Sequence, residues 1–201
     1  MAHLKFELAR DLPTLEIDNR TLYRIRALSS GTVGGFVECE SNLAQTGDSW
    51  IGDDAMVYGG AQVSGDAQVS GSAQVSGDAQ VSGDARVSDN AQVSGNALVC
   101  GGSWVCGGAQ VSGNARIGDN ARIGDNARAY GGAWVSDDAQ VYGSAQVYGS
   151  ALVYGDSWVY GSAQVSDDAR VYGAAHVSGG AMVSDSARVY GNARVSDDAR
   201  A

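Results

Sequence analysis

A hexapeptide that repeats without insertion from Gly47 to Ala201 constrains this chain more than any other feature. From Ala55 onward alanine recurs at almost every sixth residue, and a branched residue, usually valine, follows two places later. In an extended chain, residues two apart point to the same side, so alanine and valine face inward while their neighbours face outward. The Gly-Asp, Asp-Asn or Gly-Ser pair that closes a unit is typical of a turn. Each unit therefore predicts a very short strand and a corner, and the stacked units predict a β-solenoid.

Three exceptions to the repeat predict the size of one coil. Serine replaces alanine before tryptophan at Ser49-Trp50, Ser103-Trp104 and Ser157-Trp158, at intervals of 54 residues. Fifty-four is a multiple of an 18-residue, three-sided coil and not of a 12-residue, two-sided one. We therefore expect a triangular prism in which these tryptophans lie in one column, three coils apart.

The segment before the repeat has a different composition. Residues 1–46 predict a small N-terminal β cap, and residues 47–201 the solenoid. Within the cap, Leu15-Glu16-Ile17 and the segment Leu22 to Leu28 predict two strands that form a hairpin around Asp18-Asn19.

These motifs resemble a known family. Written from its valine, the unit Val-Ser-Gly-Asp-Ala-Gln resembles the hexapeptide-repeat signature. The order of Leu22 to Leu28, Gly34 to Glu38 and Ser41 to Asp48 before Trp50 is similar to the lead-in of the YdcK-like hexapeptide-repeat proteins, a bacterial and phage-associated group often labelled putative transferases. The resemblance implies an all-β fold, a left-handed triangular parallel β-helix.

Composition limits the classes of partner. Twenty-nine glycines against two phenylalanines and three methionines predict a narrow core of alanine and valine. The formal net charge of −10 argues against binding to nucleic acids or anionic membranes, although a basic partner stays possible. No stretch has the roughly 20 apolar residues of a membrane helix, and no secretory signal is visible. Three cysteines, Cys39, Cys100 and Cys106, do not make a disulfide framework. We expect a cytoplasmic protein.

Candidate catalytic residues are few. Acyltransferases with the fold that the resemblance implies use a histidine as general base and a long loop at one corner. This repeat has no interruption, and the chain has two histidines, His3 and His176. His176 occupies an outward position where glutamine or arginine usually stands, which indicates a surface residue. Zinc chemistry would need three histidine ligands. Cys100 and Cys106, six residues apart, should project from adjacent faces as replacements for surface serine. We therefore expect no enzyme, catalytic residue, cofactor or metal; the alternative is an acyltransferase with His176 in a site between subunits of a trimer.

Aspartates gather at one predicted edge of the prism. They are Asp53-Asp54, Asp89-Asn90, Asp125-Asn126 and Asp197-Asp198. Stacked oxygen ligands can bind calcium, but turn preference explains aspartate at a corner without a metal.

The outward residues sort into three faces by an 18-residue period. One carries Trp50, Trp104 and Trp158 with Arg86, Arg122, His176 and Arg194, and a second carries mostly glutamine with Met56 and Met182. The third carries Leu98, Trp134, Leu152, Tyr154, Tyr172 and Tyr190, with Arg116, Arg170 and Arg188. Exposed apolar patches mark partner surfaces, so Trp134, Leu152, Tyr154, Tyr172 and Tyr190 form the candidate interface of a non-enzymatic structural or binding solenoid. Glycan binding through the tryptophan and tyrosine rows is a further alternative.

The candidate interface leads to an expectation about association. We expect a homo-oligomer, either a trimer of prisms packed side by side through the third face or a dimer joined end to end; a different protein partner is also possible. The end-to-end form follows from a last coil that would expose Val183, Val189 and Val195.

Overall fold

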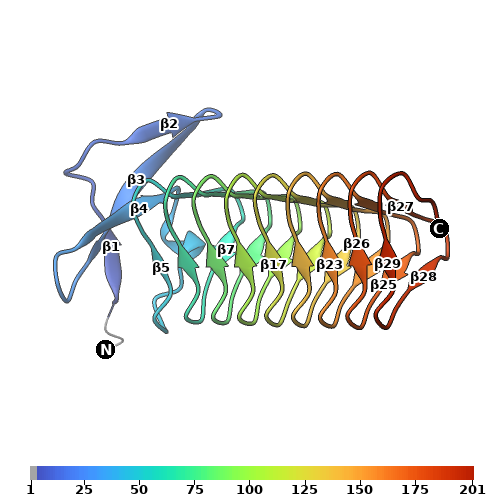
Figure 1. Cartoon of the computed structure of the whole chain (residues 1–201). Helices are drawn as coiled ribbons and strands as arrows, with labels where there is room; N and C mark the ends of the chain where they lie inside the picture. Colours follow the sequence, from blue (N-terminus) through green and yellow to red (C-terminus); the bar gives the residue numbers. More distant parts are fainter. Residues whose placement is uncertain (1–3) are drawn as a thin grey trace.

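The structure, a computed structural model, describes residues 4–201 and is a three-sided parallel β-solenoid with a β cap at its N-terminal end (Figure 1). Strands pair with partners 18 residues away, for example Gln80 with Leu98. This confirms the predicted solenoid, its 18-residue coil and its three sides. Among residues 4–201, no helix is long and apolar enough to cross a membrane.

Each side of the prism is one parallel sheet of two-residue strands. We name the sides the glutamine, tyrosine and tryptophan faces. The glutamine face contains β6 (Met56–Val57), β9 (Gln74–Val75), β12 (Gln92–Val93), β15 (Gln110–Val111), β18 (Arg128–Ala129), β21 (Gln146–Val147), β24 (Gln164–Val165) and β27 (Met182–Val183). The tyrosine face contains β7 (Gln62–Val63), β10 (Gln80–Val81), β13 (Leu98–Val99), β16 (Arg116–Ile117), β19 (Trp134–Val135), β22 (Leu152–Val153), β25 (Arg170–Val171) and β28 (Arg188–Val189). The tryptophan face contains β5 (Trp50–Ile51), β8 (Gln68–Val69), β11 (Arg86–Val87), β14 (Trp104–Val105), β17 (Arg122–Ile123), β20 (Gln140–Val141), β23 (Trp158–Val159), β26 (His176–Val177) and β29 (Arg194–Val195).

The sheet order tests the column prediction directly. On the tryptophan face, β5, β14 and β23 are each separated by two intervening strands. Trp50, Trp104 and Trp158 therefore lie in one column, three coils apart, as predicted. Because the inward alanines and valines are almost completely buried along this stack, the core is a continuous narrow column of small side chains.

The corners depend on a left-handed backbone conformation. The first residue of each turn has positive φ and is glycine or aspartate, such as Gly71 (φ 67°) and Asp89 (φ 60°). At six of the corner aspartates Oδ2 accepts a hydrogen bond from the equivalent N–H of the next coil, for example Asp53 from Gly71 at 2.9 Å and Asp89 from Gly107 at 3.0 Å. The corner aspartates thus link successive coils as well as form turns.

The N-terminal cap closes one end of the prism. It contains β1 (Phe6–Leu8), β2 (Leu15–Ile17), β3 (Arg20–Ala27), β4 (Val33–Val37) and the 3-10 turn η1 (Glu40–Asn42). β3 pairs antiparallel with β1, β2 and β4, and the predicted hairpin around Asp18-Asn19 is present between β2 and β3. Phe6 and Ile25 extend the solenoid core into the cap.

β4 already belongs to the first coil, because it pairs in parallel with β6. Gly34 and Gly35 permit this close approach: a Cβ at either position would overlap the carbonyl group of Ile51 or of Ala55. Asn42 fixes the following corner, since its Nδ2 donates to the carbonyls of Gly59 (3.1 Å) and Ala61 (2.9 Å).

The last coil differs from the expectation that Val183, Val189 and Val195 would be exposed. Val183 is completely buried, Val189 is 4% exposed and Val195 is partly buried. The expectation was wrong for Val183 and Val189 because inward side chains are enclosed by their own coil and by residues that follow, as in the bridge between Met182 and Arg200.

Candidate functional site

The structure places the five predicted interface residues on the tyrosine face. Trp134 pairs in register with Leu152. Tyr154 and Tyr172 stack with ring centroids 5.0 Å apart, and Tyr172 and Tyr190 with centroids 5.4 Å apart. Trp134 is 48% exposed and Tyr190 60% exposed. The five residues thus form one continuous strip, which we call the aromatic strip.

Two hollows flank Trp134 on this face. One, of about 210 Å³, is lined by Trp134, Ser136, Leu152 and Tyr154. The other, of about 260 Å³, lies on the side of Leu98 and Cys100. It exists because Gly118 stands where most coils carry serine or tyrosine, so no side chain fills the space beside Trp134. The tyrosine face therefore contains two recesses beside Trp134, into which side chains of another protein could insert.

Arginine is the only charged residue type among the outward strand residues of the tyrosine face. Arg116, Arg170 and Arg188 are exposed there, and the aspartates lie at the corners. The strip is therefore apolar and locally basic on a chain whose formal net charge is −10.

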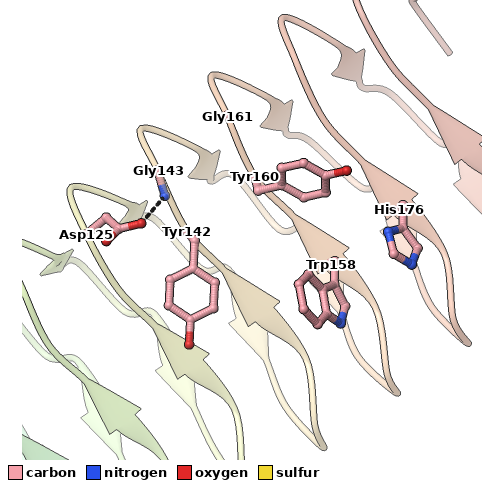
Figure 2. Close-up of a pocket in the computed structure, with 7 residues that line it drawn as sticks. All are labelled: Asp125, Tyr142, Gly143, Trp158, Tyr160, Gly161 and His176. Carbon is pink, nitrogen blue, oxygen red and sulfur yellow. Dashed lines mark hydrogen bonds between the residues drawn. The ribbon is translucent and has the colours of Figure 1, made fainter.

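The tryptophan face has a groove that sequence analysis missed. Its volume is about 560 Å³, and it is lined by Tyr142, Trp158, Tyr160, His176, Asp125, Gly143 and Gly161 (Figure 2). We call it the aromatic groove. Tyrosines on successive coils elsewhere stack in parallel, as Tyr130 and Tyr148 do at 5.0 Å.

Tyr142 and Tyr160 instead turn away from each other. Tyr142 lies against Gly124 of the preceding coil, where a Cβ would overlap its ring. Tyr160 meets the His176 ring of the following coil edge-on, with centroids 6.4 Å apart at 84°. Gly124 was the sequence signal: a glycine 18 residues before a tyrosine leaves the space in which that ring can lie flat.

His176 forms one wall of this groove. Its ring stacks on Trp158, with centroids 5.8 Å apart and planes 14° apart (Figure 2). Asp125 lies at the rim, and its Oδ2 accepts a hydrogen bond from the N–H of Gly143 at 3.0 Å. His176 is therefore held by aromatic neighbours in an outward position of the repeat.

A second groove, of about 460 Å³, lies on the same face around Trp104. Its lining residues are Asp84, Arg86, Gly102, Trp104, Asn120, Arg122 and Asp138. The guanidinium of Arg122 lies 5.9 Å from the Trp104 ring centroid. We call it the polar groove.

The cysteines project from different faces, as predicted. Cys100 follows β13 on the tyrosine face and Cys106 follows β14 on the tryptophan face. Burial raises the pKa of both thiols, and nearby aspartates add to the effect: Asp119 for Cys100, Asp89 and Asp125 for Cys106. Both thiols therefore favour the protonated form. Among residues 4–201, no group of three or more histidine, cysteine, aspartate or glutamate side chains could hold a metal ion.

Comparison with known proteins gives one family. The model described as the YdcK beta solenoid repeat matches residues 61–77, 79–91, 91–107, 145–161, 163–179 and 187–201. No curated protein matches the chain with significant similarity. The matched segments carry the repeats that build the three faces.

Proposed function

This chain belongs to the YdcK β-solenoid repeat family, and we propose that it is a non-enzymatic binding solenoid. The repeat that defines the family specifies a fold and not a reaction. Its function is to associate with further copies of itself through the tyrosine face. The observation that carries the proposal is the aromatic strip, in which Trp134 and Tyr190 are about half exposed beside stacked tyrosines. Large exposed apolar patches are unusual on monomers, and tryptophan, tyrosine and arginine dominate binding energy at interfaces.

Charge supports a second copy as the partner. Arg116, Arg170 and Arg188 give the strip a positive fringe, whereas the edge between the tryptophan and glutamine faces of the same chain carries the aspartate column of Asp53, Asp89 and Asp125. A prism that turns its tyrosine face toward the acidic edge of another prism therefore brings opposite charges together. A trimer, which the resemblance to hexapeptide-repeat proteins implies, lets each subunit use the strip and an edge at once.

The alternative is an acyltransferase whose site lies between subunits and uses His176. Against it, the His176 ring is stacked on Trp158 and touched by Tyr160, so its aromatic contacts explain its position without a catalytic role. Calorimetry with acetyl-CoA separates the two: a binding solenoid gives no heat. Stoichiometric binding that is lost in His176→Ala would favour the enzyme.

The association proposal is tested by light scattering after size-exclusion chromatography at micromolar concentration. We expect an oligomer of the 20.6 kDa chain, converted to monomer by Tyr172→Glu, which puts a charge in the middle of the strip. Tyr148→Glu is the matched control, because Tyr148 is also in a stacked pair but on the glutamine face.

Two outcomes would contradict the proposal in different ways. A wild-type chain that is monomeric would remove self-association altogether. An oligomer that survives Tyr172→Glu would exclude the aromatic strip as its interface and favour the end-to-end dimer.

A further inference from the structure

The tryptophan face carries two grooves, one toward each of its two edges. The polar groove reaches Arg122 and Asp138, and the aromatic groove begins at Asp125 and Tyr142. Arg122 is close enough to Tyr142 for its charge to oppose the burial that raises the pKa of the Tyr142 hydroxyl. A ligand that crosses the face obliquely, past Arg122 and Tyr142, therefore reaches both grooves.

The aromatic groove offers flat apolar surface on more than one side. Trp158 is 41% exposed and Tyr160 39% exposed. Stacking with His176 covers one ring face of Trp158, and its neighbour on the preceding coil is Gln140, which has no ring. Because Tyr142 and Tyr160 turn apart, a flat ligand can enter between them and lie beside Trp158 (Figure 2).

The polar groups around the two grooves combine both signs of charge. The polar groove has two guanidinium groups, Arg86 and Arg122, against two carboxylates, Asp84 and Asp138. Asn120 adds an amide, which both donates and accepts hydrogen bonds. The arginines would repel a cationic ligand, and the aspartates would repel an anionic one. The charge distribution therefore favours a neutral ligand that is rich in both hydrogen-bond donors and acceptors.

A sugar ring has this combination of properties. One side of a pyranose is an apolar layer of C–H groups that packs on an aromatic ring, and its hydroxyl rim donates and accepts hydrogen bonds. Binding sites of this kind combine aromatic walls with a few placed polar groups. From this match the geometry points to a neutral oligosaccharide as the ligand of the tryptophan face, with one sugar in the aromatic groove and further sugars along the polar groove. This surface is separate from the aromatic strip.

The test begins with a glycan microarray probed with labelled full-length chain, followed by calorimetry with the neutral oligosaccharide that binds best. Trp158→Gln is the main variant, because glutamine is the usual residue at this position of the repeat and should fold without strain. We expect it to weaken binding at least about tenfold, the loss typical of a removed aromatic anchor. Tyr160→Ser should weaken binding by a smaller factor.

Tyr148→Ser is the matched control. It removes a tyrosine at the same position of the hexapeptide as Tyr160, but from the glutamine face, and we expect glycan affinity to stay within about twofold of wild type because distant contacts are independent. The proposal is overturned if no neutral glycan on the array binds, if only charged glycans bind, or if Tyr148→Ser weakens binding as much as Trp158→Gln does. Loss of self-association in Tyr172→Glu with glycan binding unchanged would show that the two surfaces act separately.

Discussion

Two buried serine hydroxyls should lower the stability of the solenoid. Ser103 and Ser157 replace the inward alanine of the repeat and are completely buried. Within residues 4–201 neither Oγ has a hydrogen-bonding partner. A buried hydroxyl without a partner costs about 1–3 kcal/mol in lost hydration. We therefore expect Ser103→Ala and Ser157→Ala each to raise the free energy of unfolding by at least about 1 kcal/mol, which in a chain of this length corresponds to about 2–4 °C in melting temperature.

The measurement is urea unfolding followed by circular dichroism, with midpoints compared at equal m-values. The chain supplies controls in both directions. Ser49 is equivalent in the repeat, but its Oγ accepts a hydrogen bond from Nζ of Lys5 at 3.1 Å, so Ser49→Ala should leave stability unchanged or lower it. Ala85, one coil before Ser103, lies in the same column, and Ala85→Ser should reduce stability by a similar amount. Lower stability in both Ser103→Ala and Ser157→Ala would refute the reasoning, because it would mean that the hydroxyls are satisfied.

Two other predictions concern the corners and the thiols. Asp89→Ala should lower the free energy of unfolding by about 1–2 kcal/mol, because alanine at a φ of 60° is strained and the hydrogen bond from the N–H of Gly107 is lost. Asp89→Gly, which is unstrained at this φ, should stay within about 1 kcal/mol of wild type. Equal losses of stability for the two variants in urea unfolding would show that backbone strain is unimportant. Cys100 and Cys106 should react with iodoacetamide at pH 8 more slowly than free cysteine, because burial raises the pKa of both thiols and the thiolate is the nucleophile. Peptide mass spectrometry over time measures the rates, and alkylation as fast as that of free cysteine would contradict the prediction.

The repeat predicted most of the fold because each residue of a unit has one role in every coil. Alternation fixed which residues face inward, and the spacing of Trp50, Trp104 and Trp158 fixed the coil length. The first coil was harder to predict, because Leu43 takes the place of a valine there and pairs with Val63 outside the hexapeptide register. Nothing in the structure explains why serine precedes tryptophan at three of the four tryptophans.

The surface was predictable as columns but not as shapes. The period placed Trp134, Leu152 and the three tyrosines on one face, since a column depends only on residue number. It did not predict the aromatic groove, because a repeated tyrosine favours stacking as in Tyr154 and Tyr172. The orientation of Tyr142 depends on the absent side chain of Gly124 one coil away, so it follows from an exception in the column and not from the repeat.

The strict pairing of residues 18 apart has a consequence for how such a gene can change. A duplication or deletion of 54 nucleotides adds or removes one whole coil and leaves every later side chain on its original face. A change of 18 nucleotides also keeps the hexapeptide in frame, but it rotates the rest of the prism by one side. If the change lies before Trp158, Trp158 and His176 would move to a different face and would pack beside the residues of that face's column. Recombination within the repeat can therefore exchange the surfaces of this protein while its interior stays the same.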